Sequence, residues 1–236
     1  MAYLLFTGAS GYIGSHTAYC FLKNTDYHLV IIDDLSTGFK ENINYLQSCF
    51  PQRITFIKSN INDTKQMCSL FETYTFEAVI HFAASLIVGE SVFKPIEYYT
   101  NNTLNTTNLI ALCVEYGISK FIFSSTAAVY GEPPLELIPI DENAPLLPIN
   151  PYGASKMMSE RVLQDSALAY KHFEYVALRY FNVAGASMDN TPEGLKNHQG
   201  LGQRSKNATH LIKVACECAC GKRESMGIFG VDYPTK

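Results

Sequence analysis

The sequence predicts an α/β protein built on a doubly wound parallel sheet. Three observations support this: short apolar runs recur along the chain, helical stretches separate them, and glycines cluster where the first run meets the first such stretch. The apolar runs are continuous rather than alternating, as expected for strands that helices cover on both faces. This succession of strand and helix favours parallel strands joined by right-handed crossovers.

Five apolar runs are predicted to form strands, at residues 2–8, 28–33, 53–59, 77–84 and 120–126. Helices are expected between them, at residues 12–23, 39–48, 63–74 and 95–117. A fifth helix is predicted to begin at Pro151, with a sixth strand at residues 175–182 behind it. The pattern then loosens into a polar loop over residues 187–207 and one helix at about 208–220. Residues 227–236 close no structural unit, which predicts a fragment or a natural truncation.

Composition limits the classes of function. The chain has 236 residues, 47% of them hydrophobic, with a net charge of −4. It can bury one core, or one domain and part of a second. No basic patch suggests a nucleic-acid partner. No apolar run approaches the roughly 20 residues of a membrane span, and the N-terminus lacks the basic lead of a signal peptide. A soluble, cytoplasmic protein is therefore predicted.

Seven cysteines form no paired framework. Cys216, Cys218 and Cys220 form a C-x-C-x-C run, but no Cys-x-x-Cys or histidine pair nearby completes a tetrahedral metal site. On a helix Cys216 and Cys220 share one face. We therefore predict no metal, and buried, reduced thiols on a packed helix.

Glycines at the start of the first helix predict a dinucleotide site. Gly8, Gly11 and Gly14 are spaced G-x-x-G-x-x-G. Their missing side chains permit a tight turn, a close approach of backbone to a diphosphate, and close packing of helix on strand. Asp33 ends the second strand, where an acid can hold a ribose diol. Asp34 follows without an adjacent arginine, which favours NAD over NADP. Capping of a helix by Asp33 or Asp34 is the weaker alternative. The glycine spacing and the strand-end acid together predict a Rossmann-type fold that binds a dinucleotide.

Polar and small residues at the next strand ends extend this prediction. Asp63 is expected to cap the helix that follows it. Asn60 either bonds to adenine or forms a turn, and the local sequence leaves both open. The small residues within 82–84 let a cofactor lie close, although simple packing would use the same residues.

The stretch NPYGASK places a phenol and an ammonium on one helical face. Asn150 is a good N-cap and Pro151 a favoured first helical residue. Tyr152 and Lys156 then lie one turn apart. The helix dipole and the ammonium both favour an ionised phenol. Ionisation near neutral pH needs about three pKa units, or roughly 4 kcal/mol, so the positive ring of an oxidised nicotinamide is expected to be needed as well. Such a tyrosinate can deprotonate an alcohol while hydride leaves the same carbon.

Hydroxyl groups end the strand before that helix. Ser124, Ser125 and Thr126 are placed to hydrogen-bond a reacting oxygen, and capping of the following turn is their competing use. A surface tyrosine beside a snorkelling lysine is the alternative for the Tyr152 and Lys156 pair. The dinucleotide-type fold around the pair disfavours that alternative.

Seven features carry a family resemblance: TGASGYIGSH, the strand-end Asp33, HFAASLIVGES, YYTNNT, FSSTAAVYGE, NPYGASK and LRYFNVAGA. Together they resemble the extended short-chain dehydrogenase/reductases, and among these the UDP-hexose 4-epimerases. The resemblance implies interconversion of UDP-glucose and UDP-galactose through a 4-keto intermediate, with NAD as cofactor, and leaves acceptance of N-acetylated sugars open. It implies an NAD-binding domain over residues 1–180 and part of a smaller substrate domain over 181–236. It also implies a homodimer through the helix at 95–117 and the helix from Pro151.

The resemblance assigns roles by motif. Tyr152 would be the acid/base, Lys156 would hold the nicotinamide ribose, and Thr126 would bond the sugar 4-oxygen. Substrate binding would use Thr126, Tyr152 and Asn182. The implied cofactor-binding residues are Gly8, Gly11, Tyr12, Ile13, Gly14, Asp33, Asp34, Leu35, Ser36, Thr37, Gly38, Asn60, Ile61, Phe82, Ala83, Ala84, Ser85, Asn101, Ser124, Thr126, Tyr152, Lys156 and Phe181.

Departures and alternatives remain. Asn60 stands where many relatives carry aspartate, and Leu86 where some carry lysine.

A sugar-nucleotide 4,6-dehydratase would need an acidic pair at Ala127 and Ala128, so elimination of water is disfavoured. A simple NAD-dependent reductase would release its cofactor at each turnover. A non-catalytic NAD-binding protein would retain NAD without converting any sugar.

Overall fold

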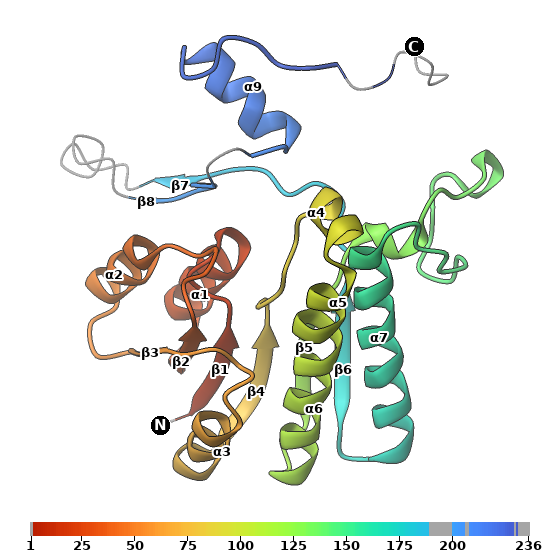
Figure 1. The fold of residues 1–236 in the computed structure, drawn as a ribbon. Coiled ribbons are helices and arrows are strands. Elements are labelled where there is room, and N and C mark those ends of the chain that lie inside the picture. The colour runs from red at the N-terminus through yellow and green to blue at the C-terminus, as the bar shows by residue number, and fades with distance from the viewer. Residues whose placement is uncertain (1, 189–199, 206–207, 229, 231–236) are drawn as a thin grey trace.

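A computed structural model describes residues 2–188, 200–205, 208–228 and 230. Six parallel strands form one sheet in the order β3-β2-β1-β4-β5-β6 (Figure 1). The strands are β1 (Tyr3–Thr7), β2 (His28–Asp33), β3 (Ile54–Lys58), β4 (Phe76–His81), β5 (Lys120–Ser124) and β6 (Glu174–Leu178). The predicted doubly wound parallel sheet is confirmed.

Helices follow most of the strands. They are α1 (Tyr12–Asn24), α2 (Lys40–Cys49), α3 (Thr64–Thr73), α4 (Val88–Phe93), α5 (Pro95–Tyr98), α6 (Asn105–Glu115), α7 (Pro151–Ala169) and α9 (Leu211–Ala219). Tighter or wider turns form η1 (Tyr99–Leu104, a π-helical segment), η2 (Ala127–Tyr130) and η3 (Leu135–Leu137). None of the helices within the described residues is both long and apolar enough to cross a membrane.

Two apolar clusters sandwich the sheet. Alternate residues of β1 point to opposite faces, as the pleat requires. Leu5 belongs to the cluster that contains α3, α6 and α7, with Leu109 and Leu163. Phe6 belongs to the cluster that contains α1 and α2, with Leu22 and Leu46. Each of these side chains is at most 2% exposed, and burying one stabilises the fold by about 1.5–3 kcal/mol.

The helix predicted over residues 95–117 is present as a continuous helical stretch from Pro95 to Glu115, but it is not a regular α-helix throughout. The chain forms α5, the π-helical segment η1 and α6 there, and the short helix α4 precedes them. In η1 the Asn102 side chain bonds to Ser85 and to Ser155, which lies far along the chain. Tertiary contacts of this kind override a local helical preference, and π-helical turns often mark functional sites.

Several other expected boundaries shift. β4 ends at His81 and β6 at Leu178, so residues 82–84 and 179–182 lie beyond their strands. Part of the loop expected over residues 187–207 forms an antiparallel pair, β7 (Ser187–Met188) with β8 (Gly200–Leu201). Residues 189–199 and 206–207 of that loop lie outside the described residues.

The prediction of buried thiols on the last helix is also wrong. Cys216 and Cys220 of α9 are exposed, and Cys218 is half-buried. Among the residues of α9, Val214 is the buried one. The thiols are exposed because only the side of the helix that carries Val214 packs against the described part of the chain.

Candidate active site

The glycine turn between β1 and α1 packs against the end of β4. Gly8 has a φ of 74°, and a Cβ there would lie 2.4 Å from the backbone nitrogen of Ala83. A Cβ on Gly14 would lie 2.5 Å from the Gly8 oxygen. A Cβ on Gly11 would meet, among the described residues, only the Gly8 oxygen at 3.3 Å. Protein contacts therefore explain the glycines at positions 8 and 14, whereas Gly11 leaves its backbone open to an outside group.

The start of α1 suits an anionic ligand. Gly11 is the N-cap of this helix and makes no side-chain capping bond, so the first amide groups of α1 are left for a ligand. Beside this turn, Ser10 Oγ is buried and has no hydrogen-bond partner among the described residues. The Tyr12 hydroxyl donates to the Gly185 oxygen at 2.7 Å, which brings the segment after β6 over the turn. These features fit a nucleotide diphosphate.

Asp33 joins the glycine turn to the loop behind β2. It is 9% exposed. Its Oδ2 accepts from the Ser10 amide at 3.0 Å, and its Oδ1 accepts from the Leu35 amide at 2.9 Å. A carboxylate has about four acceptor positions, so both oxygens can still accept from the hydroxyls of a ribose. Gly38 completes this loop, because a Cβ there would collide with Ser10.

Asn60 has the turn role that the sequence left open. Its Oδ1 accepts from the Asn62 amide at 3.0 Å, and its Nδ2 donates to Asp34 Oδ2 at 2.6 Å. Asp63 caps α3 by accepting from the Gln66 amide at 3.1 Å, which confirms that prediction. Asn60 therefore fixes the loop after β2 to the loop after β3, and its second Nδ2 hydrogen is left for a ligand.

The loop after β4 is held by the π-helical segment. Asn101 Nδ2 donates to Ser85 Oγ at 2.9 Å. Asn102 is 1% exposed, its Oδ1 accepts from the Ser85 amide at 2.8 Å, and its Nδ2 donates to Ser155 Oγ at 3.0 Å. Since Ser155 precedes Lys156, this clamp sets the loop after β4 against the first turns of α7. Asn102 lies within the YYTNNT motif, but its role could not be predicted, because its partners are distant in the chain.

Lys156 lies at the centre of these strand ends. Asn150 caps α7 by accepting from the Gly153 amide at 2.8 Å, as predicted. Lys156 is 2% exposed, donates to the Ser124 oxygen at 2.8 Å and stands 4.7 Å from the centroid of the Phe123 ring. Burial lowers the pKa of Lys156 to about 7, while the charge of Glu160 raises it. The alternative of a snorkelling surface lysine is therefore wrong.

Tyr152 stands half-buried one turn before this lysine. Its ring meets that of Tyr98 edge to face, at 6.4 Å between centroids. Burial raises the pKa of the Tyr152 phenol, and hydrogen bonding from the Thr126 side chain lowers it by less. The sequence predicted that the helix dipole and the ammonium favour an ionised phenol but need the charge of an oxidised nicotinamide as well, and in the protein alone the pKa of the phenol is raised. Desolvation outweighs them, because Lys156 is directed to a backbone oxygen.

Two predicted residues lie apart from this cluster. Phe181 is 69% exposed, and Asn182 is exposed beside it. Both follow β6 in an extended segment rather than ending a strand. Their assigned contacts to cofactor and UDP stay predictions.

Comparison with known families decides what this arrangement belongs to. Residues 4–208 match the family described as the NAD dependent epimerase/dehydratase family. This chain belongs to that family. The membership agrees with the strand-end cluster, in which the glycine turn, the acid loop and the Tyr152 and Lys156 pair come from the family's matched residues.

Relatives within the epimerase/dehydratase family are UDP-sugar 4-epimerases. The UDP-glucose 4-epimerase of Azospirillum brasilense is 45% identical over 232 residues, which cover 98% of this chain and 61% of that protein. The UDP-glucose 4-epimerase of Bacillus subtilis is 39% identical over 99% of this chain and 66% of that protein. The chain thus spans less than two thirds of the length of these relatives.

Solved structures agree in fold. The UDP-Glc/GlcNAc 4-epimerase of Campylobacter jejuni is 50% identical with a TM-score of 0.81, over 100% of this chain and 68% of that one. The UDP-glucose 4-epimerase of Bifidobacterium longum, solved with NAD+ and UDP, is 33% identical with a TM-score of 0.87, over 99% of this chain and 67% of that one. The predicted resemblance to the UDP-hexose 4-epimerases is confirmed.

His81 is buried and begins the HFAASLIVGES motif, although the sequence assigned it no role. Its Nδ1 lies 2.6 Å from Thr7 Oγ1 and its Nε2 lies 2.8 Å from Thr106 Oγ1. Burial, and secondly the charge of Lys156, lower the pKa of His81 to about 3. A neutral ring with both nitrogens bonded therefore joins β1, β4 and α6 near Lys156.

Acid is expected to destabilise the protein through His81. In the unfolded chain this histidine binds a proton below about pH 6.5, whereas the folded chain takes it up only near pH 3. Stability that is present above pH 6.5 is therefore lost as the pH falls, by about 1.4 kcal/mol per pH unit. Urea unfolding at pH 7 and pH 5 measures the loss. A His81→Gln variant should show a shallower pH dependence, and a dependence equal to that of the wild type would contradict the assignment.

Proposed function

We propose that this chain carries the NAD-binding and catalytic part of a UDP-hexose 4-epimerase that interconverts UDP-glucose and UDP-galactose. The observation that carries the proposal is the meeting of Tyr152, Lys156 and Thr126 at the strand ends, next to an uncapped glycine turn. The family membership and the UDP-glucose 4-epimerase relatives support the same activity.

NAD is the proposed cofactor. The free amides at the start of α1 suit its diphosphate, and the open acceptor positions of Asp33 suit a ribose. When bound, NAD supplies a reversible two-electron acceptor for the sugar carbon, and its oxidised ring adds a positive charge. Further residues proposed to line it are those of the motifs at the four strand ends: Tyr12, Ile13, Asp34, Leu35, Ser36, Thr37, Asn60, Ile61, Phe82, Ala83, Ala84, Ser85, Asn101, Ser124 and Phe181.

Tyr152 is proposed to move the proton of the sugar 4-hydroxyl. Since burial raises its pKa, the phenol holds its proton near neutral pH until a positive charge approaches it. Thr126, which already acts on the phenol, is proposed to hold the sugar 4-oxygen. Lys156 is proposed to bind the nicotinamide ribose from its place beside the Ser124 oxygen. The 4-keto sugar then turns over, its carbon is reduced on the other face, and Tyr152 returns the proton.

The substrate side of the proposal uses the segment after β6. Asn182 is proposed to contact UDP and Phe181 to flank the cofactor. Residues 1–180 are proposed as the NAD-binding domain and 181–236 as part of the substrate domain. A homodimer through α5, η1, α6 and α7 is also proposed, supported by Leu104 of η1 and Met158 of α7, which are 52% and 43% exposed. A cytoplasmic location completes the proposal.

An NMR assay tests the proposed activity. UDP-glucose and UDP-N-acetylglucosamine are each incubated with residues 1–236, and separately with a chain extended past Lys236, in the presence of NAD. We expect the longer chain to produce UDP-galactose from UDP-glucose. Retention of NAD without conversion of either sugar by either chain would contradict an epimerase and favour a non-catalytic NAD-binding protein.

A further inference from the structure

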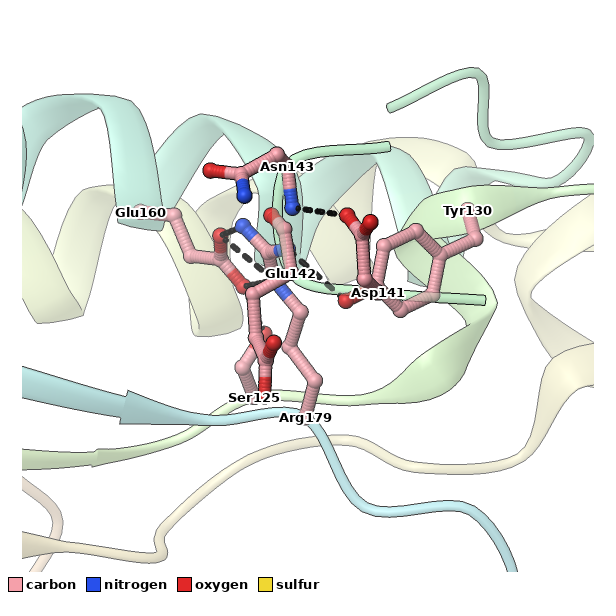
Figure 2. Close-up of polar contacts among 7 residues, drawn as sticks. All are labelled: Ser125, Tyr130, Asp141, Glu142, Asn143, Glu160 and Arg179. Atoms are coloured by element: carbon pink, nitrogen blue, oxygen red, sulfur yellow. Dashed lines mark hydrogen bonds and ion pairs between the residues drawn. The ribbon is translucent and has the colours of Figure 1, made fainter. Parts of the chain in front are cut away.

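A largely buried ion pair joins Glu160 of α7, one turn after Lys156, to Arg179 (Figure 2). Arg179, just after β6, donates from Nη2 to Glu160 Oε2 at 2.7 Å and from Nε to both oxygens of that carboxylate at 3.1 Å. The side chains of Arg179 and Glu160 are 19% and 8% exposed. A pair with this geometry is held in one arrangement, since a bidentate guanidinium fixes the carboxylate plane.

Glu160 also binds the strand end that carries the proposed catalytic groups. Ser125 donates its hydroxyl to Glu160 Oε1. Ser125 lies between Ser124, whose oxygen receives Lys156, and Thr126, whose side chain acts on Tyr152. A displacement of the Glu160 carboxylate would therefore move both of these contacts.

Arg179 extends the connection to two further segments. Its Nη1 donates to the Tyr130 hydroxyl at 2.9 Å and to the Glu142 oxygen at 3.0 Å. Tyr130 ends η2, which begins directly after Thr126. Figure 2 shows the Glu160 carboxylate, the Tyr130 side chain and the backbone of Glu142 around the Arg179 guanidinium, with Ser125 beside Glu160. One ion pair thus joins α7, β6, the end of β5 and the loop over residues 141–143.

We propose that Glu160, held by Arg179, is a positioning residue that fixes the end of β5 against α7, so that Ser124 receives Lys156 and Thr126 meets Tyr152. This inference rests on the proposed function, because it assigns Glu160 to the same reaction. Nothing in the seven motifs assigned Glu160 a role, although it lies four residues after Lys156 and so shares its helical face.

The charge of Glu160 gives the pair a second effect on the site. Among the described residues, Glu160 acts on Lys156 from the same helix, and His81 of β4 is close enough to Lys156 for the two to interact. The Lys156 ammonium contacts two uncharged groups of β5, the Phe123 ring and the Ser124 backbone oxygen. His81 is neutral near pH 7, because its pKa is about 3. The carboxylate of Glu160 is therefore the negative charge that opposes desolvation of the Lys156 ammonium.

A purely structural ion pair would not have these consequences. Replacing a buried pair with apolar groups is often neutral or stabilising, so its presence is weak evidence for a role in stability. A positioning role predicts instead that removal of the Glu160 charge changes the ionisation of Lys156 and the turnover rate in a folded protein.

The test is a Glu160→Gln substitution, which keeps an acceptor for Ser125 and Arg179 but removes the charge. The ionisation of Lys156 is followed by the pH titration of its ε-carbon NMR signal in protein labelled with ¹³C-lysine, with Lys156→Met to assign the signal. We expect the pKa of Lys156 to fall by about one pH unit. The kcat of the UDP-sugar reaction should fall about tenfold or more, while KM changes less than about twofold.

Asp165→Asn is the matched control. Asp165 also lies on α7 and accepts from Arg161 at 2.9 Å, but this pair is exposed. The Asp165→Asn substitution removes one negative charge from α7, as Glu160→Gln does, and should leave the pKa of Lys156 unchanged. Equal pKa values of Lys156 in the wild type, Glu160→Gln and Asp165→Asn would overturn the proposal.

A second variant decides the case if Glu160→Gln does not fold. Arg179→Gln leaves the carboxylate beside Lys156 without its cation, so the pKa of Lys156 should rise; a fall would overturn the proposal. Because the titration needs neither substrate nor turnover, it separates this inference from the proposed function. If Lys156 titrates as expected but the protein converts no UDP-sugar, the epimerase assignment is rejected and the positioning role of Glu160 is not.

Discussion

A Tyr152→Phe substitution is expected to reduce the interconversion of UDP-glucose and UDP-galactose by about 10²–10⁴-fold. The substitution removes the phenolic oxygen that is proposed to exchange a proton with the sugar 4-hydroxyl, and it keeps the ring that packs on Tyr98. NAD binding and the free energy of unfolding should change little, since among the described residues the phenol's polar contact is the one with Thr126. Steady-state rates measured with a chain extended past Lys236 provide the comparison.

Tyr170→Phe is the control for this change. Tyr170 is the C-cap residue of the same helix, and it is 46% exposed. Loss of its hydroxyl should leave the rate within about twofold, because an exposed group outside the site contributes little. Turnover that survives in Tyr152→Phe would show that another group moves the proton.

Substitutions in the glycine turn should separate folding from cofactor binding. Gly8→Ala is expected to lower the free energy of unfolding by at least about 2 kcal/mol, through a strained positive φ and overpacking against the end of β4. The clash is unavoidable, because the new Cβ would lie 2.4 Å from the Ala83 nitrogen. Urea unfolding measures the loss.

Gly11→Ala is expected to fold normally but bind NAD at least about tenfold more weakly. A Cβ at this position meets only the Gly8 oxygen at 3.3 Å among the described residues, so it projects where the diphosphate is proposed to lie. Calorimetric titration with NAD, beside urea unfolding of both variants, makes the comparison. Equal NAD affinity in Gly11→Ala and the wild type would place the diphosphate elsewhere.

Local patterns predicted most of the sheet and the glycine turn. The strands were recognisable because each is a continuous apolar run, and Gly8, Gly11 and Gly14 follow the first of them. The caps Asp63 and Asn150 were also predictable, because a cap bonds to an amide only three residues away. Where one short stretch of sequence determines the geometry, sequence reasoning succeeded.

Long-range contacts account for what was missed. In the π-helical segment η1, Asn102 bonds to Ser85 and Ser155, which are distant in the chain. Likewise, Glu160 of α7 pairs with Arg179, which follows the next strand, β6, in the sequence. Neither pairing has a local pattern, although the spacing of Glu160 from Lys156 was a usable signal.

The ionisation of the site could not be predicted from spacing alone. Spacing placed Tyr152 and Lys156 on one face, but burial and the direction of the ammonium set their pKa values. Lys156 donates to the Ser124 oxygen rather than to the phenol. Desolvation therefore dominates at both groups, with opposite signs for an acid and a base.

The ionisation of Tyr152 with and without NAD tests the central claim most directly. The difference in tyrosinate absorbance between the wild type and Tyr152→Phe, followed against pH, isolates this one phenol. We expect its pKa to lie above the ordinary value near 10 in the protein alone, and to fall by roughly two to three pH units when NAD+ is added. A pKa of Tyr152 that is the same with and without NAD+ would contradict the claim that the cofactor's charge converts this buried phenol into the base.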